Sequence, residues 1–130
     1  MSETHYTPGV CNLNLPEIAY RRKVSNVSLG IAVVLLIILI ATKATAATGI
    51  LLFLPTWIGY LNHLQAKNKF CVMYASSGVY SKSDNYAETA EVTDEAKHQK
   101  DKAKAGSMNI QGFVAGILGA FLSVVILAAL

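Results

Sequence analysis

The stretch of sequence that decides the fold is residues 27–64, VSLGIAVVLLIILIATKATAATGILLFLPTWIGYLNHL. One charged side chain, Lys43, interrupts it. The hydrocarbon layer of a bilayer is ~30 Å thick, and a helix crosses it with ~20 apolar residues. The stretch therefore predicts two membrane spans, at residues 25–42 and 45–64. The short connection around Lys43 predicts that the two spans form an antiparallel hairpin.

The rest of the chain predicts one further span, at residues 109–130, which are again free of charge. Only 15% of the 130 residues are charged, whereas soluble domains carry ~25%. We expect an all-α integral membrane protein with three transmembrane helices. Residues 1–24 would form a cytoplasmic N-terminal segment, and residues 65–108 would form a cytoplasmic loop between the second and third spans.

That loop contains a stretch typical of a helix, at residues 86–105. Its acidic residues come early and its lysines come late, an order that complements the helix dipole. Alanine, glutamate, lysine and glutamine all favour a helix, and Gly106 is a suitable stop. Because the apolar positions are mostly alanine, which offers little surface to bury, we expect this helix to be peripheral.

Orientation follows from the arginines and lysines, because basic residues near spans mark the cytoplasmic side of a membrane. Lys43 is the one basic residue at the far end of the predicted hairpin. The other basic residues near the spans lie at the opposite end: Arg21, Arg22, Lys23, Lys67, Lys69, Lys100, Lys102 and Lys104. We therefore expect an inner (plasma) membrane protein with a cytoplasmic N-terminus and a C-terminus outside.

Several side chains are predicted to mark particular depths in the membrane. Pro55 lies in the second span, where it removes a hydrogen bond and clashes with a carbonyl of the preceding turn, so we expect a kink there. Trp57 and Tyr60 follow it, and amphipathic aromatic rings favour the membrane interface. The basic cluster before the first span predicts further interfacial side chains: Arg21, Arg22 and Lys23.

The third span carries small residues at helical spacing. Gly112, Gly116 and Ala120 are four residues apart, and Gly119 and Ser123 lie beside them. Such a stripe lets another helix approach closely, which supports helix packing in lipid. Small residues are also simply common in membrane helices. The stripe does not say which helix packs against it. The partner is either the other two spans of the same chain or another subunit. We favour packing within the chain, because this span must dock somewhere.

The sequence contains no recognisable nucleophile motif, phosphate-binding glycine loop or paired-carboxylate arrangement, so we do not expect an enzyme. Orientation already explains the basic residues, which argues against nucleic-acid binding. His5, His63, Cys11 and Cys71 lack the spacing of a metal site, so no metal is expected. We expect no cofactor either; His63, near the membrane interface, is the weak candidate for a haem or chlorin ligand.

Two segments, GVCNLNLPEIAYRR before the first span and QAKNKFCV after the second, resemble a group of small multi-pass bacterial membrane proteins of unassigned function. The matching pairs are Cys11-Asn12, Glu17-Ile18, Arg21-Arg22, Gln65-Ala66 and Cys71-Val72. The resemblance covers a minor part of the chain and implies a bacterial membrane location. It implies no activity, cofactor or catalytic residue.

We expect a non-catalytic structural or accessory subunit of a larger membrane assembly, because three spans offer much lateral surface and no central polar pathway. Its partners would be the lipid bilayer and other membrane subunits or copies of itself. The alternative is a small homo-oligomeric channel or transporter, with a pore lined by Thr45, Thr48 and Thr56 of several copies. A holin-like former of membrane lesions is a third hypothesis.

Overall fold

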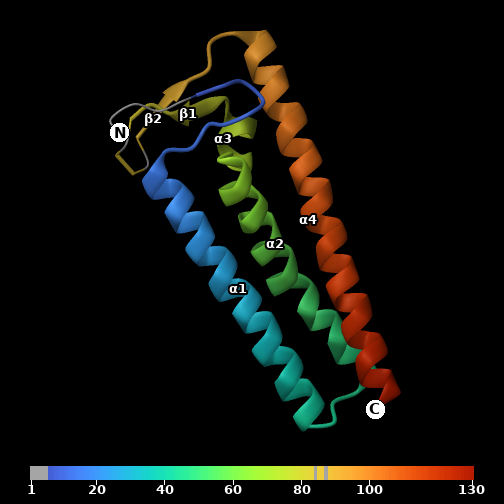
Figure 1. Cartoon of the computed structure of the whole chain (residues 1–130). Coiled ribbons are helices and arrows are strands. Elements are labelled where there is room, and N and C mark those ends of the chain that lie inside the picture. The colour runs from blue at the N-terminus through green and yellow to red at the C-terminus, as the bar shows by residue number, and fades with distance from the viewer. Residues whose placement is uncertain (1–5, 84, 87) are drawn as a thin grey trace.

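The computed structural model describes residues 6–83, 85–86 and 88–130, which are mainly helical (Figure 1). Its elements in chain order are α1 (Leu15–Ala41), the 3-10 helix η1 (Ala46–Leu52), α2 (Phe53–Asn68), α3 (Val72–Ser77), β1 (Val79–Ser81), β2 (Thr89–Glu91) and α4 (Glu95–Ala129). Two of these helices, α1 and α4, are long and apolar enough to cross a membrane.

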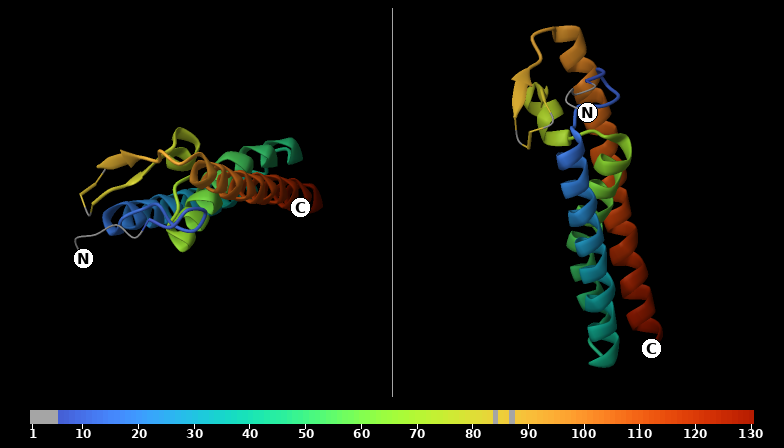
Figure 2. Two further views of the ribbon diagram at one scale, coloured as in Figure 1. Left: turned by 90° about the horizontal axis from the view of Figure 1, so that it is seen from above. Right: turned by 60° about the vertical axis from the view of Figure 1, so that its left-hand side comes forward.

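The long helices pack side by side. α2 lies between α1 and α4, which barely touch each other (Figure 1). We call α1, η1, α2 and residues 106–129 of α4 the helical layer. The other described segments, residues 6–14, 69–83, 85–86 and 88–105, gather at one end and form what we call the head (Figure 1). The turn after α1 and the C-terminus lie at the opposite end (Figure 2).

α1 is one uninterrupted helix, where we expected a separate N-terminal segment followed by a span from residue 25. Asn14 caps its start, because the side-chain oxygen accepts the backbone N–H of Glu17 at 3.0 Å. A series of buried positions recurs every seven residues: Ile18, Ser25, Ala32 and Leu39. Such spacing defines a narrow seam, so the other described segments leave most of the surface of α1 uncovered.

The second expected span, residues 45–64, is divided into two elements. η1 covers its first part, and α2 begins at Phe53 and ends at Asn68. Neither element alone has the length of a membrane span. Pro55 lies in the first turn of α2, where backbone N–H groups have no helical acceptor and proline is tolerated.

α4 differs most from the prediction. The expected separate helix at residues 86–105 is wrong, because the helix begins at Glu95 and continues through Gly106 without a break. Asp94 sets its start, since the carboxylate accepts two backbone N–H groups of the first turn. A glycine inside a helix costs about 1 kcal/mol. Tertiary packing outweighs that cost here, because Met108 in the next turn is only 1% exposed.

The N-terminal part of α4 is also not peripheral. Asp101 and Ala105 are buried, at 0% and 2% exposure, against the rest of the head. Alanine has little surface of its own, but its small size allows the close approach of α3 to α4. The prediction from alanine content was wrong because it considered the area of the side chains and not how closely the backbones pack.

Two short strands depart from the all-α prediction. β1 and β2 pair antiparallel, with Tyr80 opposite Ala90. Gly78 ends α3 with φ of 75°, a left-handed conformation that glycine adopts at little cost. The chain then reverses into β1, and the N–H of Val92 donates to the Gly78 carbonyl at 2.7 Å. The hairpin thus takes up the residues that we assigned to the first turns of a helix.

A hydrophobic core joins the head to the helical layer. Phe70 is fully buried and follows Lys69, whose φ of 55° ends α2. The N–H of Phe70 donates to the carbonyl of Gln65 at 3.0 Å, which closes the end of the helix and turns the aromatic ring inward. The buried core residues around it are Leu64, Phe70, Val72, Ala75, Ala105 and Met108.

Candidate functional site

Buried polar side chains are concentrated where the head meets α1 and α2. Burying a polar group costs free energy unless the group is hydrogen-bonded, so a cluster of them marks a site with a defined arrangement. The buried polar and charged residues in this region are Asn12, Asn14, Glu17, Asn62, Gln65, Ser81 and Asp101. We call them, together with their hydrogen-bond partners, the polar network.

Asn12 lies at the centre of the polar network and is fully buried. Its side-chain oxygen accepts the N–H of Cys71 at 2.6 Å, and its Nδ2 donates to the Cys71 carbonyl at 3.2 Å. Its own backbone N–H donates to the carbonyl of Lys69 at 2.9 Å, and its carbonyl accepts the N–H of Ser81 at 2.9 Å. One asparagine therefore ties the N-terminal segment to the end of α2 and to β1.

The Glu17 carboxylate is 5% exposed and accepts two hydroxyl donors. The Tyr74 hydroxyl donates to Oε1, and the Ser81 hydroxyl donates to Oε2. Burial, followed by the hydrogen bond to Glu17, raises the pKa of Tyr74 above its usual value. The Tyr74 hydroxyl therefore remains a hydrogen-bond donor well into the alkaline range. Through its two hydrogen bonds, the Glu17 carboxylate holds α1, α3 and β1 together.

Arg21 was predicted at the membrane interface, and the structure places its guanidinium within the polar network. Nη2 donates to the Cys71 sulfur at 3.1 Å, and Nη1 donates to the Asn62 side-chain oxygen at 3.4 Å. Gln65 extends the chain of contacts, because it donates to the same Asn62 oxygen at 3.3 Å and accepts the N–H of Val72 at 3.0 Å.

A second buried carboxylate, Asp101 of α4, holds the N-terminal segment. It accepts the Tyr6 hydroxyl at 2.6 Å and the N–H of Gly9 at 2.7 Å. The ring of Tyr6 stacks on that of Tyr80, with 4.3 Å between centroids. Burial, followed by the hydrogen bond to Asp101, raises the pKa of Tyr6. These contacts fix residues 6–11 against α4 and the hairpin.

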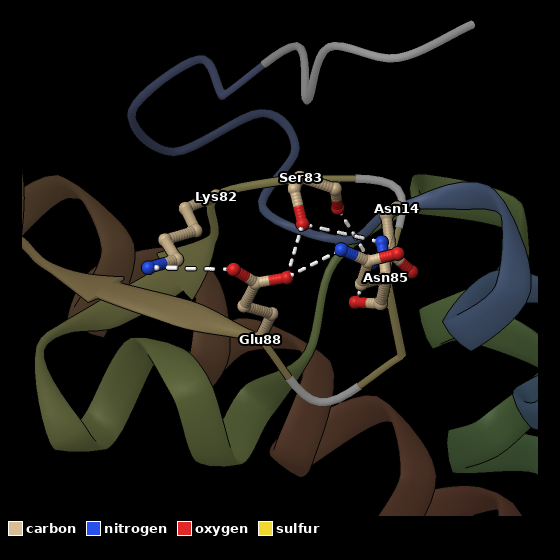
Figure 3. A network of polar contacts seen from close by, with 5 residues as sticks. All are labelled: Asn14, Lys82, Ser83, Asn85 and Glu88. Carbon is tan, nitrogen blue, oxygen red and sulfur yellow. Dashed lines mark hydrogen bonds and ion pairs between the residues drawn. The ribbon is translucent and has the colours of Figure 1, made fainter.

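The turn between the two strands has a polar arrangement of its own, drawn in Figure 3. The Glu88 carboxylate accepts Asn85 Nδ2 at 2.7 Å and the Ser83 hydroxyl at 2.8 Å, and it pairs with Lys82 at 3.4 Å. Asn14 Nδ2 donates to the carbonyls of Ser83 and Asn85. The hydrogen bonds from Asn85 and then Ser83 lower the pKa of Glu88. The turn is thereby tied to the start of α1.

The polar network is suited to holding segments together. Cys71 is fully buried, and Asn12 occupies both of its backbone hydrogen-bonding groups. Across the described parts of the chain, no three histidines, cysteines or acids come together in a way that could hold a metal ion. His5, one of the weak metal candidates, lies outside the described residues.

The glycines of the third predicted span face α2 of the same chain. A Cβ at Gly116 would lie 2.9 Å from side-chain atoms of Phe53 and Trp57, and one at Gly119 would lie 2.8 Å from Thr56. Gly112 is close to Leu61 and Trp57. Ala120 is half-buried, and Ser123 is buried, with its hydroxyl donating to the Gly119 carbonyl at 2.8 Å. We call this α2–α4 contact the glycine seam.

Gly49 of η1 extends the glycine seam from the other side. A Cβ there would lie 2.6 Å from the backbone nitrogen of Val124 and 2.8 Å from the carbonyl carbon of Ser123. Such distances to backbone atoms leave no room for any side chain. η1 and the end of α4 therefore pack backbone to backbone, as small residues permit in membrane helices.

The remaining predicted site residues are spread over the outside of the helices. Trp57 stacks on Phe53, with 5.8 Å between centroids, and Tyr60 packs on the hydrophobic core. His63 and Arg22 line a pocket between α1 and α2, and Lys23 is exposed. The structure therefore brings Arg22 and His63 together. The ring of Tyr60 lies beside that of His63, with 6.1 Å between centroids.

Sequence reasoning missed the roles of Glu17 and Asp101. A signal for Asp101 was present, because it lies eleven residues before Gly112 and so on the same helical face. Extending the small-residue stripe towards the N-terminus would have found it. Glu17 gave no comparable signal, because its partners Tyr74 and Ser81 lie 57 and 64 residues further along the chain.

Comparisons with protein-family models, curated proteins and solved structures found no match to this chain. The resemblance to small bacterial membrane proteins therefore stays a prediction, and function is argued from the residues.

Proposed function

We propose that the chain is a non-catalytic accessory subunit of a larger assembly in a bacterial inner membrane. The helical layer supports the membrane location, since α1 and α4 have the length and apolar character of membrane spans. η1 and α2 run between them, and by their rise per residue the two elements together extend about 38 Å. That length supports a third crossing of the membrane.

The distribution of basic residues supports an orientation with the head in the cytoplasm. Arg22, Lys67 and Lys104 lie near the head, and Lys43 lies at the opposite end of the helical layer. Basic residues prefer the cytoplasmic side. The C-terminus, at the end of α4, would then lie outside.

The observation that carries the proposal is the open packing of the outer helices. α1 and α4 each contact α2 and barely touch one another, so both keep an apolar face that none of the other described segments covers. Val33 and Ile37 of α1 are each 59% exposed, and Phe121 of α4 is 62% exposed. A thin layer of helices with two uncovered faces is suited to lateral association with other membrane helices.

The polar network supports a structural role for the head. Its carboxylates and amides are occupied by partners from distant parts of the chain, so they are positioned to hold the head in one arrangement. The channel alternative has less support, because Thr56 packs against Gly119 and the Thr48 hydroxyl donates to the Thr45 carbonyl at 2.6 Å. Those contacts occupy the side chains of Thr48 and Thr56 within one chain.

Purification in a mild detergent followed by native mass spectrometry tests the proposal. We expect the chain in a complex of fixed stoichiometry, with foreign subunits or further copies. Replacing the exposed Phe121 by alanine is expected to weaken that complex, whereas Ile50→Ala, on the equally exposed η1 surface, serves as the matched control. A single chain without partners in several mild detergents would contradict the proposal, and a self-assembled ring that conducts ions in liposomes would favour the channel.

A further inference from the structure

A polar pocket of about 300 Å³ lies between α1 and α2 near the head. Six residues line it: Arg22, Ser25, Asn26, His63, Ala66 and Lys67. Ser25 and Ala66 are buried and form the floor, whereas the guanidinium, imidazole and ammonium groups belong to exposed residues around it. The pocket is therefore open to the surroundings and carries its charged groups at the rim.

The electrostatics of the pocket favour an anion. Arg22 and Lys67 contribute two positive charges from facing helices, and the lining contains no carboxylate. In the described part of the chain, neither side chain has an ion-pair or hydrogen-bond partner. This differs from Arg21, one residue earlier, whose guanidinium donates to Asn62 and Cys71. Adjacent arginines thus have different roles, and Arg22 is available to a ligand.

We propose that this pocket binds the phosphate of an anionic phospholipid, with Arg22 and Lys67 as its main partners. Guanidinium and ammonium groups are the usual phosphate ligands in proteins, and basic pockets between membrane helices on the cytoplasmic side bind anionic headgroups. Ser25, Asn26 and His63 supply further polar groups to the headgroup. The proposal rests on the membrane location proposed above and not on the identity of any partner subunit.

The surface next to the pocket favours a lipid over a free anion. Leu29, Val33 and Ile37 lie three, seven and eleven residues after Asn26 and so continue along the same face of α1. Their exposed fractions are 36%, 59% and 59%. The distance along the helix from Asn26 to Ile37 is about 16 Å, close to one leaflet of a ~30 Å hydrocarbon layer. An acyl chain has an apolar surface of matching length beside the headgroup.

Two other hollows in the described part of the chain lack this combination. The groove on α1 lined by Val27, Gly30, Ile31, Val34, Leu35 and Ile38 is wholly apolar. The pocket at the opposite end of the helical layer contains a single basic side chain, Lys43. The charge is therefore concentrated at the head end of the α1–α2 contact, where a cytoplasmic-leaflet headgroup would lie.

Native mass spectrometry of the detergent-solubilised full chain tests the proposal, with phosphatidylglycerol and phosphatidylcholine added in separate titrations. We expect one phosphatidylglycerol to bind more tightly than phosphatidylcholine. Each basic residue near a membrane surface contributes about fivefold to the affinity for anionic lipid, so Arg22→Gln with Lys67→Gln is expected to weaken phosphatidylglycerol binding about 25-fold. Lys23→Gln is the matched control, because Lys23 is exposed on the same turn but does not line the pocket.

Each outcome of the titrations is informative. If Lys23→Gln weakens binding as much as the substitutions in the pocket, or if phosphatidylcholine binds as tightly, the attraction is diffuse and the site is absent. If inorganic phosphate displaces phosphatidylglycerol at equal concentration, the pocket is a free-phosphate site and the lipid proposal fails. Foreign subunits appear in the same spectra as separate masses, so a failed lipid site and a failed accessory-subunit proposal are distinguished.

Discussion

The helical layer and the head are held together by different kinds of contact. The glycine seam depends on the absence of side chains, with Gly49 and Gly116 allowing other groups to approach to van der Waals distance. The head depends on side chains that are present and directional, with Asn12 and Glu17 each joining several segments. The layer should therefore be sensitive to added volume, and the head should be sensitive to lost hydrogen bonds.

Gly49→Ala should have the largest effect, because it adds a methyl group 2.6 Å from a backbone atom that has no rotamer to change. We expect the free energy of unfolding in detergent to fall by about 3 kcal/mol, at the upper end of the cost of overpacking. Gly30→Ala is the control, because no atom lies within 4 Å of the added Cβ. Equal stability of the two variants would show that η1 and α4 do not pack as described.

Asn12→Ala tests the head in the opposite way, by removing a side chain. The substitution leaves the N–H and carbonyl of the buried Cys71 without their partner, which we expect to cost about 2 kcal/mol. Amide exchange should increase in residues 69–81 and stay unchanged in the glycine seam. Asn109→Ala, at an exposed position of α4, should leave exchange unchanged in both regions. If amide exchange in Asn12→Ala were accelerated equally across the chain, the head and the helical layer would unfold as one unit.

Alkaline titration should loosen the head before the layer. The pKa values of Tyr6 and Tyr74 are raised in the folded protein, so their stabilising contribution is fully present below the usual tyrosine pKa of about 10. It is lost as the pH rises above that value. Limited proteolysis should therefore begin in the head above about pH 10, and replacing both tyrosines by phenylalanine should remove this pH dependence. Cleavage that is independent of pH in the parent chain would contradict the assignment.

The smallest effect is expected at the end of α2. Lys69 has a positive φ of 55°, a conformation that costs non-glycine residues about 1–2 kcal/mol. Lys69→Gly should therefore stabilise the junction of layer and head by about 0.5–1 kcal/mol, after allowing for the greater flexibility of glycine when unfolded. Thermal unfolding in detergent measures the change. Lys67→Gly, within the same helix, should instead destabilise the protein.

The parts of the structure that the sequence predicted are those controlled by local pattern. Long charge-free stretches predicted apolar helices near residues 25–42 and 109–130, and α1 and α4 cover all but the last residue of each stretch. The predicted helix boundaries are wrong where contacts between residues far apart in the sequence determine the local structure. Composition favoured a helix from residue 86, but the pairing of Thr89–Glu91 with β1 prevailed.

The candidate site was predictable only in part, for a related reason. The basic cluster identified Arg21 and Arg22 as important, but nothing local distinguishes them. Arg21 faces Cys71, 50 residues away, and Arg22 lies beside the pocket lined by His63 and Lys67. Which of two adjacent arginines faces inward depends on how α1 docks on α2. That docking is determined by all the contacts along the two helices together.

The continuity of α4 fixes the angular phase between head and layer. Asp101 anchors the N-terminal segment, and Gly112 begins the glycine seam on the same continuous helix. One residue inserted between them would rotate the seam by about 100° relative to the head. Seven inserted residues would restore the phase to within about 20°, yet would displace the head by about 10 Å from the end of α2. The interval from Asp101 to Gly112 therefore tolerates no change of length, whereas the turn between β1 and β2 can lengthen without moving either anchor.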